Sequence, residues 1–244
     1  MLDEPQPRLR VRRTIAEAWR LYRLLFQRSV TAAAIVFAVD ALLRLAGEGA
    51  GGTYGALLGV VAFVYSLAAP SLVQGALIEI VRNVHEGHAP ERVLPLLELG
   101  RTRLWALVTG SFLYALGILG GLILFVIPGF IVIARWSLIP PLVVLERMGV
   151  LDARDRSREL VRGHGVDVFW CLVFAWIVAA VVPLLVGLSH LSFGSSVFIS
   201  FVWSSLTAPL AAHVLSVVYY RLAEPSRPVI DPAVLGWRSV WDGE

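Results

Sequence analysis

Long runs of apolar residues divide this chain, and the polar residues gather in the segments between them. Residues 104–127 are apolar on every face, whereas the strands of a membrane barrel alternate with a period of two. A helix needs roughly 20 mostly apolar residues to cross a bilayer, and it satisfies its own backbone hydrogen bonds there. The pattern predicts six membrane-spanning helices, at residues 30–46, 57–81, 104–125, 130–145, 168–188 and 197–220.

Turn-forming residues separate these predicted spans in pairs. Glycine-rich residues 47–55, the Pro128-Gly129 pair and residues 189–196 each predict a tight connection. We therefore expect the six spans to form three hairpins. Pro70 lies near the middle of the second span and predicts a kink, because proline removes a backbone donor inside a helix.

Composition supports the membrane class. Hydrophobic residues make up 57% of the chain and charged residues 16%, against about 45–50% and 25% in soluble domains. We predict an all-α polytopic membrane protein. Residues 1–28 form an N-terminal arm, residues 29–222 a six-helix membrane domain and residues 223–244 a tail.

The basic residues indicate the orientation. All 21 are arginine, and 19 of them lie before the first span, in the second and fourth connectors or after the last span. Cytoplasmic segments carry such an excess, so both termini and these connectors are expected in the cytoplasm of a bacterial cell membrane. A cleaved signal peptide is the rival interpretation of the N-terminus, but seven arginines in the first 28 residues argue against it.

Amphipathic segments precede the first, third and fifth spans. Residues 14–28 place apolar side chains at spacings of three and four, and residues 90–103 and 149–163 hold the equivalent positions. We expect three cytoplasmic interfacial helices, each followed by a hairpin. Their arginines are candidates for contact with anionic lipid headgroups: Arg20, Arg23, Arg28, Arg101, Arg103, Arg156, Arg158 and Arg162.

Five charged residues fall at membrane depth: Asp40, Arg44, Glu79, Arg135 and Glu146. Each costs about 2.5–3.5 kcal/mol there unless it is paired or hydrated. Asp40 and Arg44 are four residues apart on one helical face, so we expect them to form an ion pair.

Arg135 and Glu146 stand about 16 Å apart along one helix and need other partners. For Arg135 the candidates are Glu79, Gln74, Asp40, an anionic lipid headgroup, or backbone carbonyls. Pro140 and Pro141 free such carbonyls one turn earlier, and this break predicts either an ordinary kink or the wall of a cavity.

Other chemistry is not indicated. His85 and His88 lack the spacing of four that places two zinc ligands on one helical face, so we expect no metal or cofactor. Cys171 lies inside a span and is expected to be a buried structural thiol. No phosphate-binding loop or nucleophile elbow is present, so we do not expect an enzyme. The arginines beside the spans are explained by orientation and lipid, not by nucleic acid.

Residues 128–163 read PGFIVIARWSLIPPLVVLERMGVLDARDRSRELVRG. With Pro128-Gly129, Arg135, Pro141, Glu146, Asp152-Ala153, Ser157 and Arg162-Gly163, this segment resembles the membrane domain associated with glycerophosphoryl diester phosphodiesterases, a family of six-span bacterial proteins. The resemblance implies the six-span architecture but not catalysis. Members named phosphodiesterases owe that activity to a separate soluble barrel, which we do not expect in this chain.

Two functions are consistent with these features. The first is a noncatalytic membrane protein that organises anionic lipid or partner proteins through its basic cytoplasmic helices. The alternative is a small transporter or lipid-handling permease, with a polar cavity between spans two and four that uses Arg135 with Glu79 or Glu146.

Overall fold

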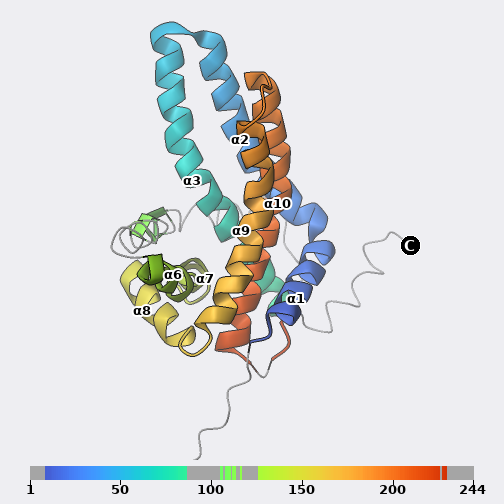
Figure 1. Cartoon of the computed structure of the whole chain (residues 1–244), viewed down its shortest axis with the longest axis vertical. Helices are drawn as coiled ribbons and strands as arrows, with labels where there is room; N and C mark the ends of the chain where they lie inside the picture. Colours follow the sequence, from blue (N-terminus) through green and yellow to red (C-terminus); the bar gives the residue numbers. More distant parts are fainter. Residues whose placement is uncertain are drawn as a thin grey trace, which may run out of the picture.

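The computed structural model describes residues 9–86, 105–106, 108–110, 112–113, 116, 126–225 and 227–229, and this part of the chain is helical and contains no strand. Its main helices are α1 (Val11–Leu24), α2 (Phe26–Ala50), α3 (Gly52–His85), α6 (Val126–Arg135), α7 (Ile139–Leu145), α8 (Val150–Leu160), α9 (Gly165–Gly187) and α10 (Phe193–Ala223) (Figure 1).

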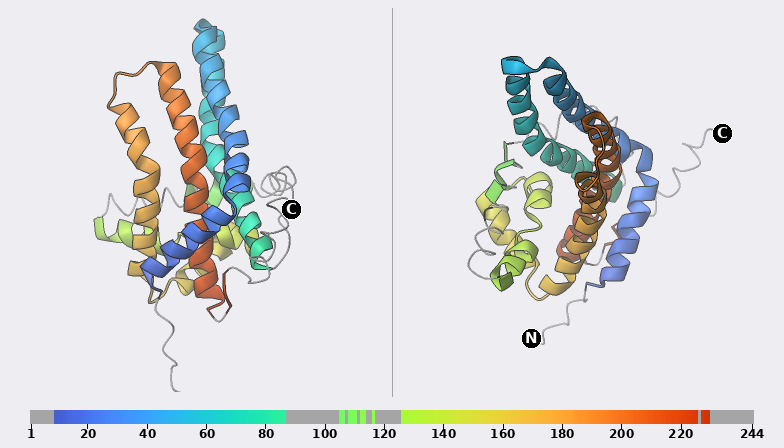
Figure 2. Two further views of the ribbon diagram at one scale, coloured as in Figure 1. Left: turned by 90° about the vertical axis from the view of Figure 1, so that its right-hand side faces the viewer. Right: turned by 45° about the horizontal axis from the view of Figure 1, so that its top comes forward.

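Four of these helices, α2, α3, α9 and α10, are long and apolar enough to cross a membrane. α2 and α3 run antiparallel and meet at Gly51, whose φ of 61° is a conformation that glycine adopts without strain. α9 and α10 form a second antiparallel pair, held by the indole nitrogen of Trp203, which donates to the carbonyl of Val178 at 3.2 Å. The α2–α3 pair extends beyond the tip of the α9–α10 pair (Figure 2).

The predicted fourth span is not one continuous helix. Residues 130–145 contain the end of α6, a turn at Trp136–Leu138, and α7. Pro140 lacks the amide that would donate to Trp136, and the amide of Ile139 bonds that carbonyl instead, at 3.3 Å. α7 has 7 residues and is too short to cross a bilayer, and the described part of α6 has 10.

The expected turn at Pro128-Gly129 is also wrong. Both residues are helical and lie inside α6. The predicted third span and the second amphipathic segment lie mostly outside the described residues. The structure therefore supports four candidate membrane spans. The arrangement of six spans in three hairpins remains a prediction.

α1 is amphipathic and packs against protein. Its buried side is formed by Thr14, Ala18, Leu21 and Tyr22, and the helix crosses the lower part of α10 (Figure 2). Burial raises the pKa of Tyr22, which keeps its hydroxyl protonated to donate to the carbonyl of Leu206 on α10 at 3.1 Å. This face of α1 is therefore committed to α10 and not to lipid.

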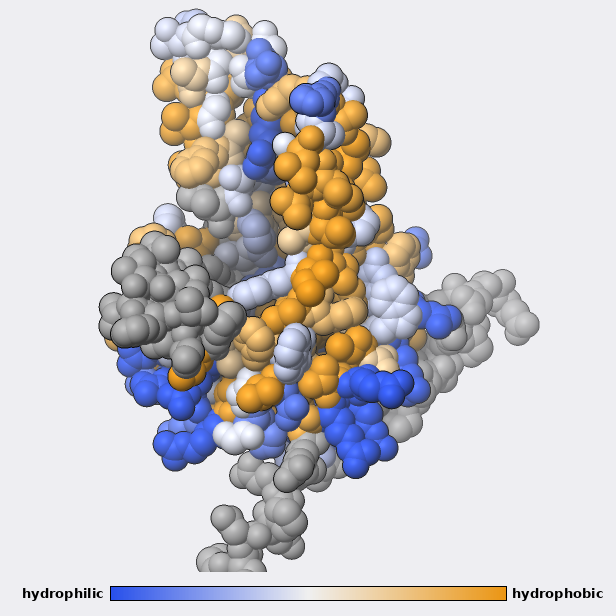
Figure 3. Space-filling model, in the orientation of Figure 1, coloured by the Kyte–Doolittle hydropathy of each residue, from blue (hydrophilic) through white to orange (hydrophobic). Residues whose placement is uncertain are grey.

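The tightest packing lies at one end of the bundle. The C-terminal half of α3 packs on α7, and Leu77, Ile80, Leu138 and Leu142 are fully buried there. Towards the other end the apolar side chains face outward, as Tyr54 does at 78% exposure. Figure 3 shows the same division, with hydrophobic side chains along the long helices and hydrophilic ones at the packed end. Such an apolar exterior is the surface that a bilayer covers.

Candidate functional site

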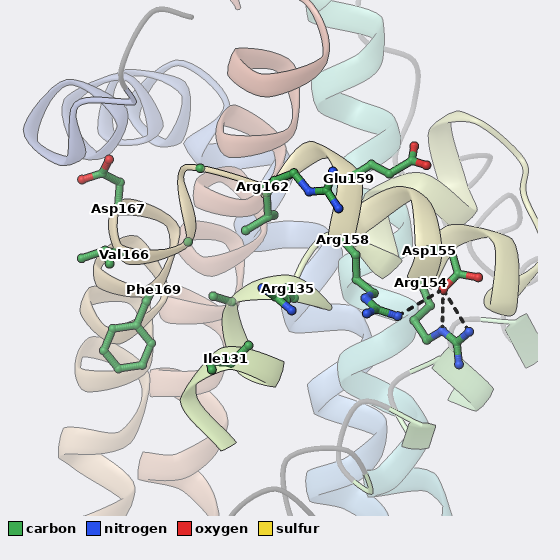
Figure 4. Close-up of a pocket in the computed structure, with 14 residues that line it drawn as sticks. Ile131, Arg135, Arg154, Asp155, Arg158, Glu159, Arg162, Val166, Asp167 and Phe169 are labelled. Atoms are coloured by element: carbon green, nitrogen blue, oxygen red, sulfur yellow. Dashed lines mark hydrogen bonds and ion pairs between the residues drawn. The ribbon is translucent and has the colours of Figure 1, made fainter. Parts of the chain in front are cut away.

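An open groove of about 950 Å³ lies at the packed end of the bundle, between α6, α8 and the beginning of α9. Four arginines line it: Arg135 at the end of α6, Arg154 and Arg158 on α8, and Arg162 in the turn after α8. Figure 4 shows Arg135 in the middle of the group, between Arg158 on one side and Phe169 of α9 on the other. We call this set of residues the arginine groove.

Ser157 fixes the wall of the arginine groove. This buried residue of α8 donates its hydroxyl to the carbonyl of Arg135 at 2.7 Å and accepts from the amide of Leu138 at 3.2 Å. Both backbone groups belong to the break between α6 and α7, where the regular helical bonds are interrupted. One hydroxyl thus joins α8 to the break and sets where the Arg135 side chain begins.

Acidic residues neutralise only part of the groove. Asp155 pairs with Arg154 at 2.9 Å and with Arg158 at 3.9 Å. The Arg154 guanidinium also lies 5.9 Å from the centre of the Trp136 ring, within the range of a cation–π contact.

Glu159 pairs with Arg156 at 3.3 Å. Among the described residues, the guanidinium groups of Arg135 and Arg162 have no ion-pair or hydrogen-bond partner. The arrangement is suited to bind an anion between them.

The headgroup candidates divide into three groups. Arg158 and Arg162 line the arginine groove, whereas Arg156 points to Glu159 and is not among the residues that line it. Arg20 and Arg23 are exposed on α1, and Arg28 is half-buried in the first turn of α2. Arg101 and Arg103 lie outside the described residues.

Arg154 was missed by the sequence analysis. The sequence pattern that could have identified it is the spacing of four between positions 154, 158 and 162, which places three arginines along one side of a helix.

The predicted pair between Asp40 and Arg44 is confirmed, with Arg44 Nε 2.8 Å from Asp40 Oδ2. The second oxygen of Asp40 is buried and has no hydrogen-bond partner among the described residues. Asp40 lines a cavity of about 380 Å³ between α2, α3, α9 and α10, whose walls are apolar apart from Asp40, Arg44 and several serines. Ser196, Ser200 and Ser204 line the cavity from α10 at spacings of four.

Arg135 does not meet the acidic residues proposed as its partners. Glu79 is buried and pairs with Arg82, one turn later on α3. Glu146 accepts a hydrogen bond from the Tyr219 hydroxyl of α10 at 2.9 Å. In the described part of the chain, Arg135, Glu79 and Glu146 therefore lie at three separate places and are not brought together around one cavity.

His85 holds the beginning of the C-terminal tail. The ring is buried against Tyr220, with 3.9 Å between ring centres. Its Nδ1 lies 3.1 Å from the carbonyl of Val229 and its Nε2 3.3 Å from Glu224 Oε2. This residue is a structural anchor, and in the described residues no three His, Cys, Asp or Glu side chains gather as metal ligands would.

Comparison with known proteins gives no relative: no family model, no curated protein and no solved structure matches the chain.

Proposed function

We propose that this chain is an integral membrane protein that organises anionic lipid or partner proteins at the cytoplasmic face of a bacterial cell membrane, without catalytic activity of its own. In this proposal both termini are cytoplasmic. The resemblance of residues 128–163 to the six-span membrane domain described above is consistent with it, and membership of that family is part of the proposal.

One observation carries the proposal: most of the described arginines lie at the same end of the bundle, next to helices with an apolar exterior. The beginnings of α1 and α9, the ends of α3 and α10, and the whole of α8 meet there (Figure 1). Near the opposite turns, the described residues include a single arginine, Arg44, which is paired with Asp40. Each arginine beside an anionic surface contributes about 1 kcal/mol of attraction.

The lipids that remain bound after purification in mild detergent test this proposal. Mass spectrometry of the protein-bound fraction is expected to show anionic phospholipid enriched several-fold over its share in the host membrane. The reason is that the basic end retains headgroups while detergent replaces the lipid around the apolar helices. A bound fraction with the composition of the bulk membrane would contradict lipid organisation.

A second candidate function, transport, is favoured by the cavity beside Asp40. A buried carboxylate oxygen without a partner is costly in hydrocarbon and is often found on ion or substrate pathways. Proteoliposomes loaded with a pH-sensitive dye distinguish the two functions. A proton-coupled transporter shows flux that Asp40→Asn abolishes and Ser189→Ala leaves unchanged, whereas a lipid organiser shows no flux in either variant.

A further inference from the structure

We propose that the arginine groove is a binding site for one anionic phospholipid, with the phosphate between Arg135 and Arg162 and an acyl chain along the outer face of α9. This inference rests on the proposed function and deepens it, because it replaces a diffuse basic surface with a single site.

The polar half of the site is defined by the two guanidinium groups that lack described partners. Arg135 comes from α6 and Arg162 from the turn after α8, so the site exists only in the folded protein. The Asp155 carboxylate is already shared between Arg154 and Arg158. A phosphate between Arg135 and Arg162 accepts charge-assisted hydrogen bonds from both guanidinium groups. The planar guanidinium matches the geometry of phosphate oxygens, which is why arginine binds phosphate well.

The apolar half of the site lies next to the arginines, and the carboxylate of Asp167 interrupts it between Val166 and Phe169. Ile131 of α6 is 44% exposed and Val166 of α9 is 71% exposed, and Phe169 lines the same groove. Further along α9, Trp170 and Ile177 are also exposed, so the apolar strip runs from the groove towards the middle of the bundle. A soluble phosphate leaves this strip in water, whereas the chain of a phospholipid covers it.

Chain direction supports the same occupant. α9 begins at the basic end at Gly165 and runs towards the opposite turn, beside α10. A lipid in the adjacent leaflet has its headgroup at the basic end and its chains parallel to α9. The charged half of the groove thus lies where the headgroup of such a lipid lies, and the apolar half lies where its acyl chains run.

The test compares two variants that each remove two charges at the same end of the protein. The full chain is purified in detergent, and binding of brominated phosphatidylglycerol is measured by quenching of the intrinsic tryptophan fluorescence. Arg135→Gln with Arg162→Gln is expected to weaken binding roughly 10- to 30-fold, because the variant loses two guanidinium contacts with the headgroup, each worth about 1 kcal/mol. Arg12→Gln with Arg13→Gln on α1 is the matched control, because both residues are exposed and neither is a headgroup candidate. It is expected to change binding less than about twofold, since a surface arginine outside the site adds little.

Val166→Asp provides a second variant that does not disturb the core. Position 166 is exposed in the first turn of α9, where an aspartate suits the helix dipole. The added carboxylate faces the groove, and we expect binding of phosphatidylglycerol to fall while the melting temperature stays the same. Unchanged binding in this folded variant would overturn the proposed site.

The remaining outcomes separate the possible ligands. If inorganic phosphate displaces the brominated lipid at concentrations that match the affinity for the lipid, the site binds a soluble phosphate and the lipid assignment is wrong. If both double variants weaken phosphatidylglycerol binding equally, the groove proposal fails and lipid organisation by a diffuse basic surface stands. If the wild type binds phosphatidylcholine as tightly as phosphatidylglycerol, both proposals fail.

Discussion

The hydroxyl of Ser157 satisfies two backbone groups at the break between α6 and α7. Regular helices need no such help, because each amide bonds a carbonyl four residues earlier. At the break, Pro140 and Pro141 remove two donors, and the chain turns before α7 begins. The Ser157 hydroxyl bonds two other groups at this turn, the carbonyl of Arg135 and the amide of Leu138, whose regular helical bonds are interrupted there.

Ser157→Ala is expected to destabilise the protein by roughly 1–3 kcal/mol, because it leaves the buried amide of Leu138 and the partly buried carbonyl of Arg135 without this partner. Thermal unfolding followed by tryptophan fluorescence measures the change. Ser189→Ala is the control, since Ser189 is exposed and bonds only the carbonyl of Val186 in its own turn. Equal melting temperatures for the two variants would show that the Ser157 bridge does not stabilise the break.

Local sequence spacing predicted some residue contacts and not others. The Asp40–Arg44 pair follows from a spacing of four on one helix. The bond between Tyr219 and Glu146 joins residues 73 positions apart, and no local pattern indicates it. Arg158 and Arg162 were recognisable as headgroup candidates, but their meeting with Arg135 depends on how α8 folds against α6.

At the level of helices, the long apolar runs predicted α2, α3, α9 and α10 well, because an apolar stretch of that length has few alternatives. The span predicted at residues 130–145 is not confirmed, because a turn at Trp136–Leu138 interrupts this apolar segment near the Pro140-Pro141 pair. Proline is common in membrane helices, so its presence alone does not distinguish a kink from a helix end. The Ser157 hydroxyl that stabilises the break comes from another helix.

The attachment of α1 to α10 depends on an ion pair between Glu17 and Arg221, in which two nitrogens of the guanidinium donate to the two carboxylate oxygens. Both side chains are partly exposed, at 21% and 35%. A double-mutant cycle with Glu17→Gln and Arg221→Gln is expected to give a coupling free energy of about 0.5–1 kcal/mol. Thermal melts measure it, and a coupling of zero would mean that packing alone holds α1.

The start of the tail is attached to α3 through His85. We expect His85→Ala to release residues 224–229, since the variant loses both ring nitrogens and the stacking on Tyr220. Hydrogen exchange read by mass spectrometry is the measurement, and peptides that cover Arg227 and Val229 are expected to exchange faster. His190→Ala, in the turn between α9 and α10, is the control that leaves this exchange unchanged. Protection that persists in His85→Ala would place the anchor elsewhere.

For the molecule as a whole, the segregation of charge predicts which parts share a side of the membrane. In a Cys171→Ala background, single cysteines at Asp152 and Ser189 place a label on α8 and in the turn after α9. We expect a membrane-impermeant maleimide added to intact cells to label position 189 and not 152. Position 152 is expected to react only after the cells are opened. Labelling of both positions in intact cells would contradict the proposed topology.

The last helix in the described part of the chain, α10, supplies a partner to several earlier segments. α10 gives the carbonyl of Leu206 to Tyr22, a ring nitrogen of His213 to Ser29, the hydroxyl of Tyr219 to Glu146 and the guanidinium of Arg221 to Glu17. During synthesis, these earlier groups leave the ribosome long before residues 206–221 exist. These four contacts therefore form only once α10 has been made, and a truncated product that ends before α10 leaves all four groups without these partners.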